Sequence, residues 1–324
     1  MSVVTSKNRG IHVAALAVTA SVVAFGGHAL AADTSVTMTP TGPQPTTVTV
    51  NLGDKLTWVN SGSTNYVIAS ARLGITSPAI PPSGSFEYLA TRSGTFSYQQ
   101  QGPDRRSTFK GTIVVLRTGM VTLSTPRESV RYGSQVMLSG KTTLPGFPVT
   151  IERKPARERS WLKLAAVTPA PDGTFSILVK PTVGATYRAT ALDNELVSKM
   201  VSLAVLPRVT IGSSARRISG GRTVNLTVRV VPPAAASTVE IMRYDRRQRQ
   251  WRRITTPRLS AKGVARYSWT VSFGRTLLRG WLKAKNLEPG YAESYSAQIL
   301  VQGTGKPPEA KRTNRHPRSQ PRGS

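Results

Sequence analysis

The chain has 324 residues, with 44 Lys+Arg against 15 Asp+Glu and no cysteine. This length is sufficient for two or three domains with hydrophobic cores. The lack of cysteine excludes disulfides, thiolate metal ligands and cysteine nucleophiles. A formal net charge of +29 favours anionic polymers or surfaces as partners. A genome rich in arginine codons would produce the same composition, and this alternative stays open.

Residues 1–31 have the pattern of a secretory signal peptide. Lys7 and Arg9 precede an apolar run over 11–25, and Ala29-Leu30-Ala31 supplies a cleavage site. About 20 apolar residues are needed to span a bilayer, so an uncleaved anchor is the weaker interpretation. No second apolar run of that length follows. We therefore expect a secreted, extracellular protein without a transmembrane segment after cleavage, associated with the cell envelope.

Alternating apolar and polar residues, typical of β-strands, run through the rest of the chain. Examples are TVTV at 47–50, TFSILV at 174–179 and TVNLTVRVV at 223–231. Gly, Pro, Asn and Ser separate these runs at short intervals, which favours β-sandwiches over α/β units. The sequence therefore predicts an all-β fold. The predicted units are 33–117, 118–206 and 207–302, followed by a disordered basic tail, 303–324.

Three ordered segments characterise the first predicted unit. They are VTVNLGDKLTWVNSGSTNYVI at 48–68, PPSGSFEYLATRSGTFSYQ at 81–99 and KGTIVVL at 110–116. Together they resemble the cupredoxin family, which includes plastocyanin and amicyanin. The resemblance implies a Greek-key β-sandwich. Its expected core consists of Leu56, Trp58, Val67, Phe86, Phe96, Tyr98, Ile113 and Val115.

The copper ligands of that family are missing. A type 1 copper site needs two imidazoles, one thiolate and a weak axial thioether. The positions to which the resemblance assigns them are Tyr66, Gln100, Pro103 and Phe109. None of these side chains is a good copper ligand, and the only histidines are His12, His28 and His316. We predict a unit that folds without copper or another cofactor, with a hard-cation site at Tyr66, Gln100 and Asp104 as the weaker alternative.

The loop that carries the ligands in cupredoxins is rich in amides and guanidinium groups here. If this end of the sandwich has been reused for recognition, the contacting residues are Gln99, Gln100, Gln101, Arg105 and Arg106. Copper-binding electron transfer, which the family resemblance alone implies, remains the first alternative function.

The second half of the chain contains an internal repeat. The clearest matches, 90 residues apart, are Val149 with Val239, Ile151 with Ile241, Trp161 with Trp251 and Gly173 with Gly263. About ninety residues is the size of one immunoglobulin-like sandwich. Both repeats resemble the Ig-like modules found in tandem in secreted actinobacterial proteins, a resemblance that implies architecture and hardly any function. Leu206-Pro207 is expected to form a short, stiff junction between them.

Positive charge is concentrated in the second repeat. Residues 207–302 hold 18 Lys+Arg against 4 Asp+Glu, whereas 33–117 hold 7 against 4. The candidate anion-binding patch consists of Arg243, Arg246, Arg247, Arg249, Arg252 and Arg253. We expect it to bind anionic cell-envelope polymers or another envelope protein, with a solvated hairpin tip as the alternative. Nucleic acid would be bound by the same electrostatics but is not an expected partner of a secreted protein.

Tryptophans and carboxylates suggest two further functions. The tryptophans at 161, 251, 269 and 281 fit core positions better than a sugar-stacking platform. Zinc catalysis and a Ser-His-Asp triad are excluded because the predicted units lack histidine. The carboxylates available for glycoside hydrolysis are Asp54, Glu87 and Asp104, for which solvated surface roles are the preferred interpretation. We conclude that the protein is a non-enzymatic envelope-binding or structural protein, with a carbohydrate-active envelope enzyme as the second alternative.

Overall fold

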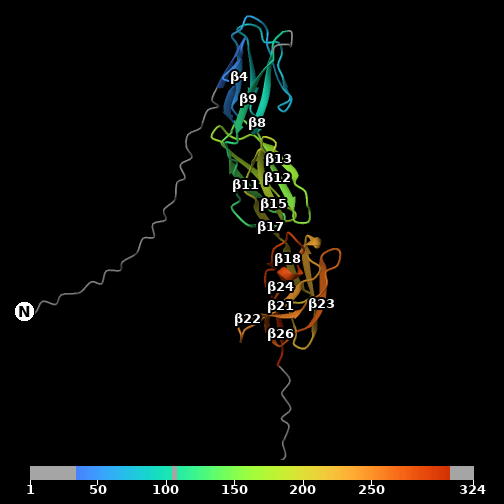
Figure 1. Ribbon diagram of the computed structural model, residues 1–324. Coiled ribbons are helices and arrows are strands. Elements are labelled where there is room, and N and C mark those ends of the chain that lie inside the picture. The colour runs from blue at the N-terminus through green and yellow to red at the C-terminus, as the bar shows by residue number, and fades with distance from the viewer. Residues whose placement is uncertain (1–33, 104–107, 307–324) are drawn as a thin grey trace, which may run out of the picture.

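The computed structural model describes residues 34–103 and 108–306 (Figure 1). Strands dominate these ranges, whose only helices are two short 3-10 segments, η1 (Pro233–Ala235) and η2 (Ala284–Asn286). The predicted all-β fold is therefore confirmed. No helix in the described ranges is long and apolar enough to cross a membrane. The predicted signal peptide, 1–31, and the predicted tail beyond 306 lie outside the described residues.

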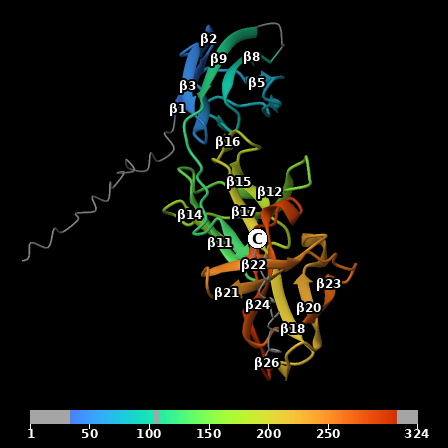
Figure 2. The ribbon, with the colours of Figure 1, turned by 90° about the horizontal axis from the view of Figure 1, so that it is seen from below.

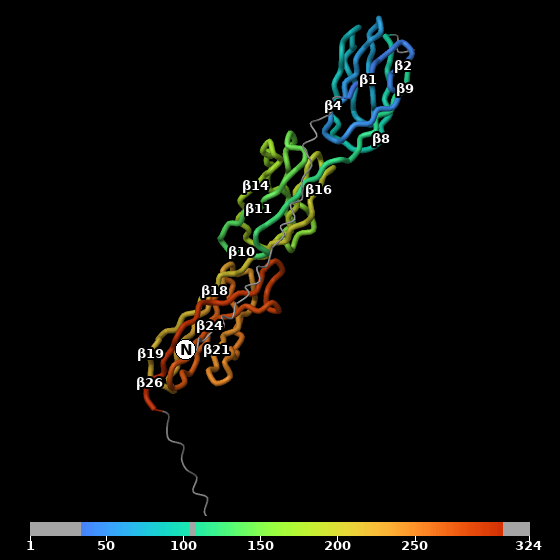
Figure 3. Tube along the Cα trace, turned by 90° about the vertical axis from the view of Figure 1, so that its left-hand side faces the viewer, coloured from blue at the N-terminus to red at the C-terminus, as the bar shows by residue number. Residues whose placement is uncertain are grey.

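The strands form three sandwiches that follow one another in a row (Figure 1 and Figure 3). Their strands fall within 34–116, 129–206 and 208–304, which we call the first, second and third units. Each unit consists of two sheets that bury side chains between them. Figure 2 shows the two sheets of the third unit on opposite sides of that unit.

The first unit is held together by an aromatic contact between its sheets. The smaller sheet has the order β2 (Gly42–Gln44), β1 (Thr34–Thr39), β4 (Lys55–Asn60) and β7 (Ser85–Leu89). The larger sheet has the order β3 (Thr47–Asn51), β9 (Thr108–Leu116), β8 (Gly94–Gln101), β5 (Val67–Ser70) and β6 (Ile75–Thr76). Trp58 of β4 and Tyr98 of β8 meet across the sandwich, with ring centroids 5.3 Å apart.

Strand alternation decides which predicted core residues are buried. The buried ones are Leu56, Trp58, Phe96, Tyr98, Ile113 and Val115, as predicted. Val67 is only half-buried, because Ile68 and Ser70 are the inward-facing residues of β5. Phe86 is also half-buried, because β7 is an edge strand.

The larger sheets of the second and third units share one strand order, which is how the internal repeat appears in the topology. The larger sheet of the second unit has the order β10 (Ser129–Arg131), β17 (Val201–Leu206), β15 (Ala185–Ala191), β12 (Val149–Pro155) and β13 (Leu162–Val167), with β16 (Leu196–Val197) beside β15. That of the third unit has the order β19 (Arg217–Ser219), β26 (Ile299–Thr304), β24 (Gly274–Leu282), β21 (Glu240–Asp245) and β22 (Gln250–Thr255), with β25 (Ser294–Tyr295) beside β24. The smaller sheets are β11 (Val136–Lys141) with β14 (Thr174–Val179), and β18 (Arg208–Ser213) with β20 (Thr223–Val231) and β23 (Val264–Thr270).

The repeat extends to irregularities within the strands. The pairing of β12 with β13 shifts register between Ile151 and Glu152, and that of β21 with β22 shifts between Ile241 and Met242. These two bulges lie at equivalent positions in the two units. A bulge re-aims the side chains beside it, so the backbone of the two larger sheets changes direction at the same point of the repeat.

The junction between the second and third units is an interface rather than an exposed linker. Only Pro207 separates β17 from β18. The segment between β24 and β25 contacts the second unit, where the Gly290 carbonyl accepts hydrogen bonds from the Gly184 amide (2.9 Å) and the Val205 amide (3.1 Å). Tyr291 packs against the hydrophobic cores of both units. The two units therefore share hydrogen bonds and buried surface that the sequence did not indicate.

The last strand runs past the predicted start of the tail at residue 303. Gly303 and Thr304 continue β26 and pair with Ile218 and Ser219 of β19. The third unit therefore extends at least to residue 304.

Candidate functional site

Three of the four positions that the cupredoxin resemblance assigns to copper ligands lie at one end of the larger sheet in the first unit. Gln100 pairs with Ile68 on one side and with Phe109 on the other. Its side chain is completely buried, and its amide nitrogen donates to the Thr39 carbonyl at 2.7 Å. Tyr66 is buried just before β5. The fourth position, Pro103, is exposed.

This set of side chains does not fit a copper ion. Phe109 and Pro103 have no donor atom. Gln100 offers only its amide oxygen, Oε1, which is buried without a hydrogen-bond partner among the described residues. An amide oxygen suits hard cations and does not replace the imidazoles and thiolate of a type 1 copper site. The chain has no cysteine, and its histidines lie outside the described residues. Among the described residues, no three His, Cys, Asp or Glu side chains are grouped to hold a metal ion. Asp104, the third residue of the hard-cation alternative, lies outside the described residues.

The candidate recognition loop is only partly available for contact. Gln99 and Gln101 share one face of β8, and the Gln101 amide donates to the Gln99 side-chain oxygen at 3.1 Å. Gln100 was expected to contact a ligand but faces the core, because successive residues of a strand point to opposite faces. Arg105 and Arg106 lie outside the described residues.

Two of the three candidate carboxylates of the first unit have structural partners, and the third, Asp104, lies outside the described residues. The Asp54 carboxylate accepts a hydrogen bond from the Asn51 amide at 2.7 Å and closes the turn between β3 and β4. Glu87 forms an ion pair with Lys55, with a nitrogen-to-oxygen distance of 3.0 Å. Neither carboxylate lines a cavity described below.

Three of the four tryptophans expected in the core lie on outer sheet faces instead. Trp269 is buried, as predicted. Trp161, Trp251 and Trp281 are half-buried, and each carries a cationic side chain over its ring. In β24, Leu278 and Leu282 point into the core, so Trp281 points outward.

The predicted anion-binding patch is divided between paired and unpaired arginines. Arg252 pairs with Asp245, with Nε 3.1 Å from Oδ2, and also contacts the Gln248 side chain. Arg253 lies 3.9 Å from Glu240. The patch residues that are exposed and have no ion pair among the described residues are Arg243, Arg246, Arg247 and Arg249.

Asp245 organises the tip of this hairpin between β21 and β22. Its carboxylate accepts hydrogen bonds from the amides of Arg247 (3.0 Å) and Gln248 (3.2 Å). The Gln248 amide is the main cause that lowers the pKa of Asp245 from its usual value, and Arg252 lowers it further. The loop is therefore held by its one carboxylate, which accepts two backbone amides and pairs with Arg252.

A buried carboxylate lies on the outer face of the same sheet. Glu240 is only 1% exposed, and neither of its oxygens forms a hydrogen bond. Its ion pairs are long, with 3.4 Å to Lys283 and 3.9 Å to both Arg253 and Lys285. One negative charge is therefore surrounded by three positive charges, and this part of the face has an excess of positive charge.

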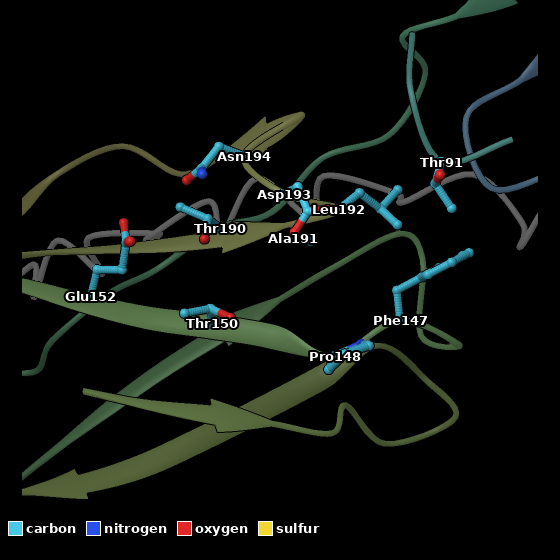
Figure 4. A pocket seen from close by; sticks show the side chains of 10 residues that line it. All are labelled: Thr91, Phe147, Pro148, Thr150, Glu152, Thr190, Ala191, Leu192, Asp193 and Asn194. Atoms are coloured by element: carbon cyan, nitrogen blue, oxygen red, sulfur yellow. The ribbon is translucent and has the colours of Figure 1, made fainter. Parts of the chain in front are cut away.

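A cavity of about 350 Å³ lies between the first and second units (Figure 4). Thr91 comes from the first unit, and the other lining residues belong to the second unit. Glu152 lines it but pairs with Arg188 at 2.6 Å. Beside the cavity, the Ser93 hydroxyl donates to the Glu195 carboxylate at 2.7 Å and links the two units. We therefore interpret the cavity as a gap at the junction between the two units, not as a binding site.

Comparison with known proteins gives little beyond this geometry. No protein-family profile and no curated protein match the chain. Among solved structures, a purple cupredoxin from Nitrosopumilus maritimus is 20% identical and matches 26% of this chain and 100% of its own, with a TM-score of 0.23. A methionine-to-alanine mutant of amicyanin with Cu(I) is also 20% identical, over 26% of this chain and 82% of its own, with a TM-score of 0.23. Such low TM-scores do not establish a shared fold.

Proposed function

We propose that this protein is a secreted, non-enzymatic component of the cell envelope that binds anionic polymers through its third unit. The observation that carries the proposal is the group of exposed arginines at the β21–β22 hairpin that form no ion pair with any residue the structure describes. Positive charges that are not neutralised by neighbours attract polyanions, and the attraction weakens as salt is added. Another envelope protein with an acidic surface would be bound by the same charges.

In this proposal the other two units position the third. The first is a cupredoxin-like sandwich without copper ligands, and the second and third are Ig-like sandwiches joined through a shared interface. The side chains at the four ligand positions do not favour electron transfer. The structural partners of Asp54 and Glu87 do not favour glycoside hydrolysis.

The test compares two variants of the full chain that lose the same charge. The first replaces Arg246 and Arg247 by serine and Arg249 by asparagine, because Asn tolerates the positive φ of 52° at that position. Arg252 is kept because it pairs with Asp245. The control variant replaces three exposed basic residues of the second unit by serine. These are Arg127, Lys180 and Lys199.

The readout is binding to immobilised anionic wall polymer at several salt concentrations. The hairpin variant is expected to bind at least about tenfold more weakly than the parent, as the loss of several charge contacts implies. The control variant is expected to bind nearly as well as the parent. An equal loss in both variants would mean that net charge alone is responsible, and would refute the assignment of the site to the hairpin.

A further inference from the structure

The two repeats differ at one arginine of their larger sheets. Pairing of β12 with β15 places Glu152 opposite Arg188 in the second unit. Pairing of β21 with β24 places Met242 opposite Arg279 at the same point of the third unit. An acidic neighbour in one repeat is thus an apolar neighbour in the other.

In the second unit the arginine is neutralised. The Arg188 Nε donates to the Glu152 carboxylate at 2.6 Å. The guanidinium also lies 4.3 Å from the ring centroid of Trp161. The ion pair with Glu152 and the contact with the Trp161 ring therefore give Arg188 a structural role within the second unit.

In the third unit the arginine has aromatic neighbours and no carboxylate. The Arg279 guanidinium lies 4.2 Å from the ring centroid of Trp251, 4.8 Å from that of Trp281 and 5.1 Å from that of Tyr295. It forms no hydrogen bond or ion pair among the described residues, and its Nε is buried without a partner. Burial lowers the pKa of Arg279 from its usual value, the direction expected for a cation without a counter-ion.

Two of these rings have no counterpart in the second unit. Trp281 pairs with Tyr295, whereas the corresponding pair of the second unit is Thr190 with Val197. Tyr295 is 66% exposed, so its ring is accessible from solvent. We call Trp251, Arg279, Trp281 and Tyr295 the aromatic–arginine face.

The surroundings of this face are basic. Lys283 lies 4.6 Å above the ring of Trp281. The side chains of Lys285 and Arg253 are 64% and 57% exposed. Glu240 is buried beneath these cations, and the exposed Glu293 accepts a hydrogen bond from the Ala284 amide at 2.8 Å. Cations outnumber carboxylates around the face, which favours a ligand that carries negative charge.

We propose that the aromatic–arginine face binds the sugar rings of an acidic polysaccharide. The apolar C–H face of a pyranose ring packs on the exposed ring of Tyr295, and its carboxylate pairs with the guanidinium of Arg279, which Trp251 and Trp281 hold in place. This inference rests on the proposed function and specifies the chemistry of its polymer. Single-stranded nucleic acid also combines flat rings with charge, but the signal-peptide pattern favours a glycan.

The test uses three probes with the full chain in calorimetric titrations. Oligogalacturonate carries charged sugar rings, poly-glutamate carries similar charge without rings, and maltodextrin carries rings without charge. We expect oligogalacturonate to bind most tightly, poly-glutamate to bind more weakly and maltodextrin to show no measurable binding. An oligothymidylate that bound more tightly than oligogalacturonate would replace the glycan by a nucleic acid and overturn the inference.

Two variants connect the binding to the face. Tyr295→Ser removes an exposed ring, and Met242→Glu restores the carboxylate that Glu152 supplies in the second unit. Each is expected to weaken oligogalacturonate binding about tenfold. Tyr295→Ser should leave poly-glutamate binding unchanged. Val197→Ser, at the position of Tyr295 in the second unit, is the matched control and should change neither affinity.

The outcomes separate this inference from the proposed function. If oligogalacturonate and poly-glutamate bind equally and Tyr295→Ser changes neither, the inference is refuted and the binding of anionic polymers stands. If neither polyanion binds the parent protein, both are refuted. A melting curve of Met242→Glu shows whether that variant is folded. If it is unfolded, Tyr295→Ser alone tests the inference, because an exposed side chain can be replaced without disturbing the core.

Discussion

Gly290 tests whether the second and third units are held together as a pair. Its φ of 89° lies in the left-handed region, which strongly favours glycine. A Cβ at this position would lie 2.9 Å from the Ala156 Cβ and 2.9 Å from the Val183 Cγ2. The Gly290 carbonyl also accepts the amides of Gly184 and Val205. Gly290→Ala therefore strains the interface at several atoms.

The expected cost follows from these contacts. A left-handed conformation costs alanine about 1–2 kcal/mol. Loss of the two hydrogen bonds across the interface adds roughly 1 kcal/mol each. The total, about 3–4 kcal/mol, falls on the contact between the units, because the cores of both sandwiches are unchanged.

Calorimetry and limited proteolysis measure this effect. We expect the second and third units of the parent to unfold in one transition, and Gly290→Ala to split it into two. Cleavage near Pro207 should become faster in the variant. Gly212→Ala is the control, because a Cβ there meets no atom within 4 Å. If both variants melted and were cleaved like the parent, the two units would unfold independently. The interface would then contribute no measurable free energy to stability.

Three further predictions concern single features. Adding Cu(II) to the full chain should produce no intense visible band and no shift in melting temperature. A stoichiometric shift would contradict the conclusion that the side chains at these positions do not bind copper. Gly111→Ala should destabilise the first unit by about 1–3 kcal/mol in denaturant melts, because the added Cβ would overlap the Tyr98 ring. A neutral effect would disprove this packing. The pKa of Asp245, measured by NMR, should lie below 3.8 because the Gln248 amide stabilises its charged form. The contribution of this hydrogen bond should be present above pH 3.8 and lost as the pH falls through the lowered pKa, and a pKa at or above 3.8 would rule it out.

Alternation and spacing predicted most of the fold. In β4, the apolar residues Leu56 and Trp58 alternate with Lys55 and Thr57, so this part of the strand and its buried face are apparent from the sequence. The repeat was predictable because one strand order with one set of turns preserves spacing over about ninety residues. Charge counts likewise located the basic hairpin.

The outward position of Trp281 was not predicted, because the inward row of its strand contains a glycine, Gly280. In β24 the inward row is Leu278, Gly280 and Leu282, and a Cβ at Gly280 would already lie 3.1 Å from Val228 of the facing sheet. A glycine in the inward row makes the outward Trp281 look like the apolar residue that should be buried. The rule that tryptophan belongs in the core fails here because cations cover the ring.

The junctions could not be predicted because they depend on contacts far apart in the sequence. Ser93 meets Glu195, and Gly184 meets Gly290, across about a hundred residues in each case. No local pattern marks such pairs. These contacts arise only because neighbouring units meet end to end in space (Figure 1).

Cosedimentation of the full chain with isolated cell envelopes tests the central claim most directly. At low salt the protein should sediment with the envelopes. It should be released as salt rises toward about 1 M, where the screening length falls to roughly 3 Å. The variant with Arg246, Arg247 and Arg249 replaced should need less salt for release than the parent. A parent protein that stays in the supernatant at low salt, or a variant that is released at the same salt as the parent, would contradict the account.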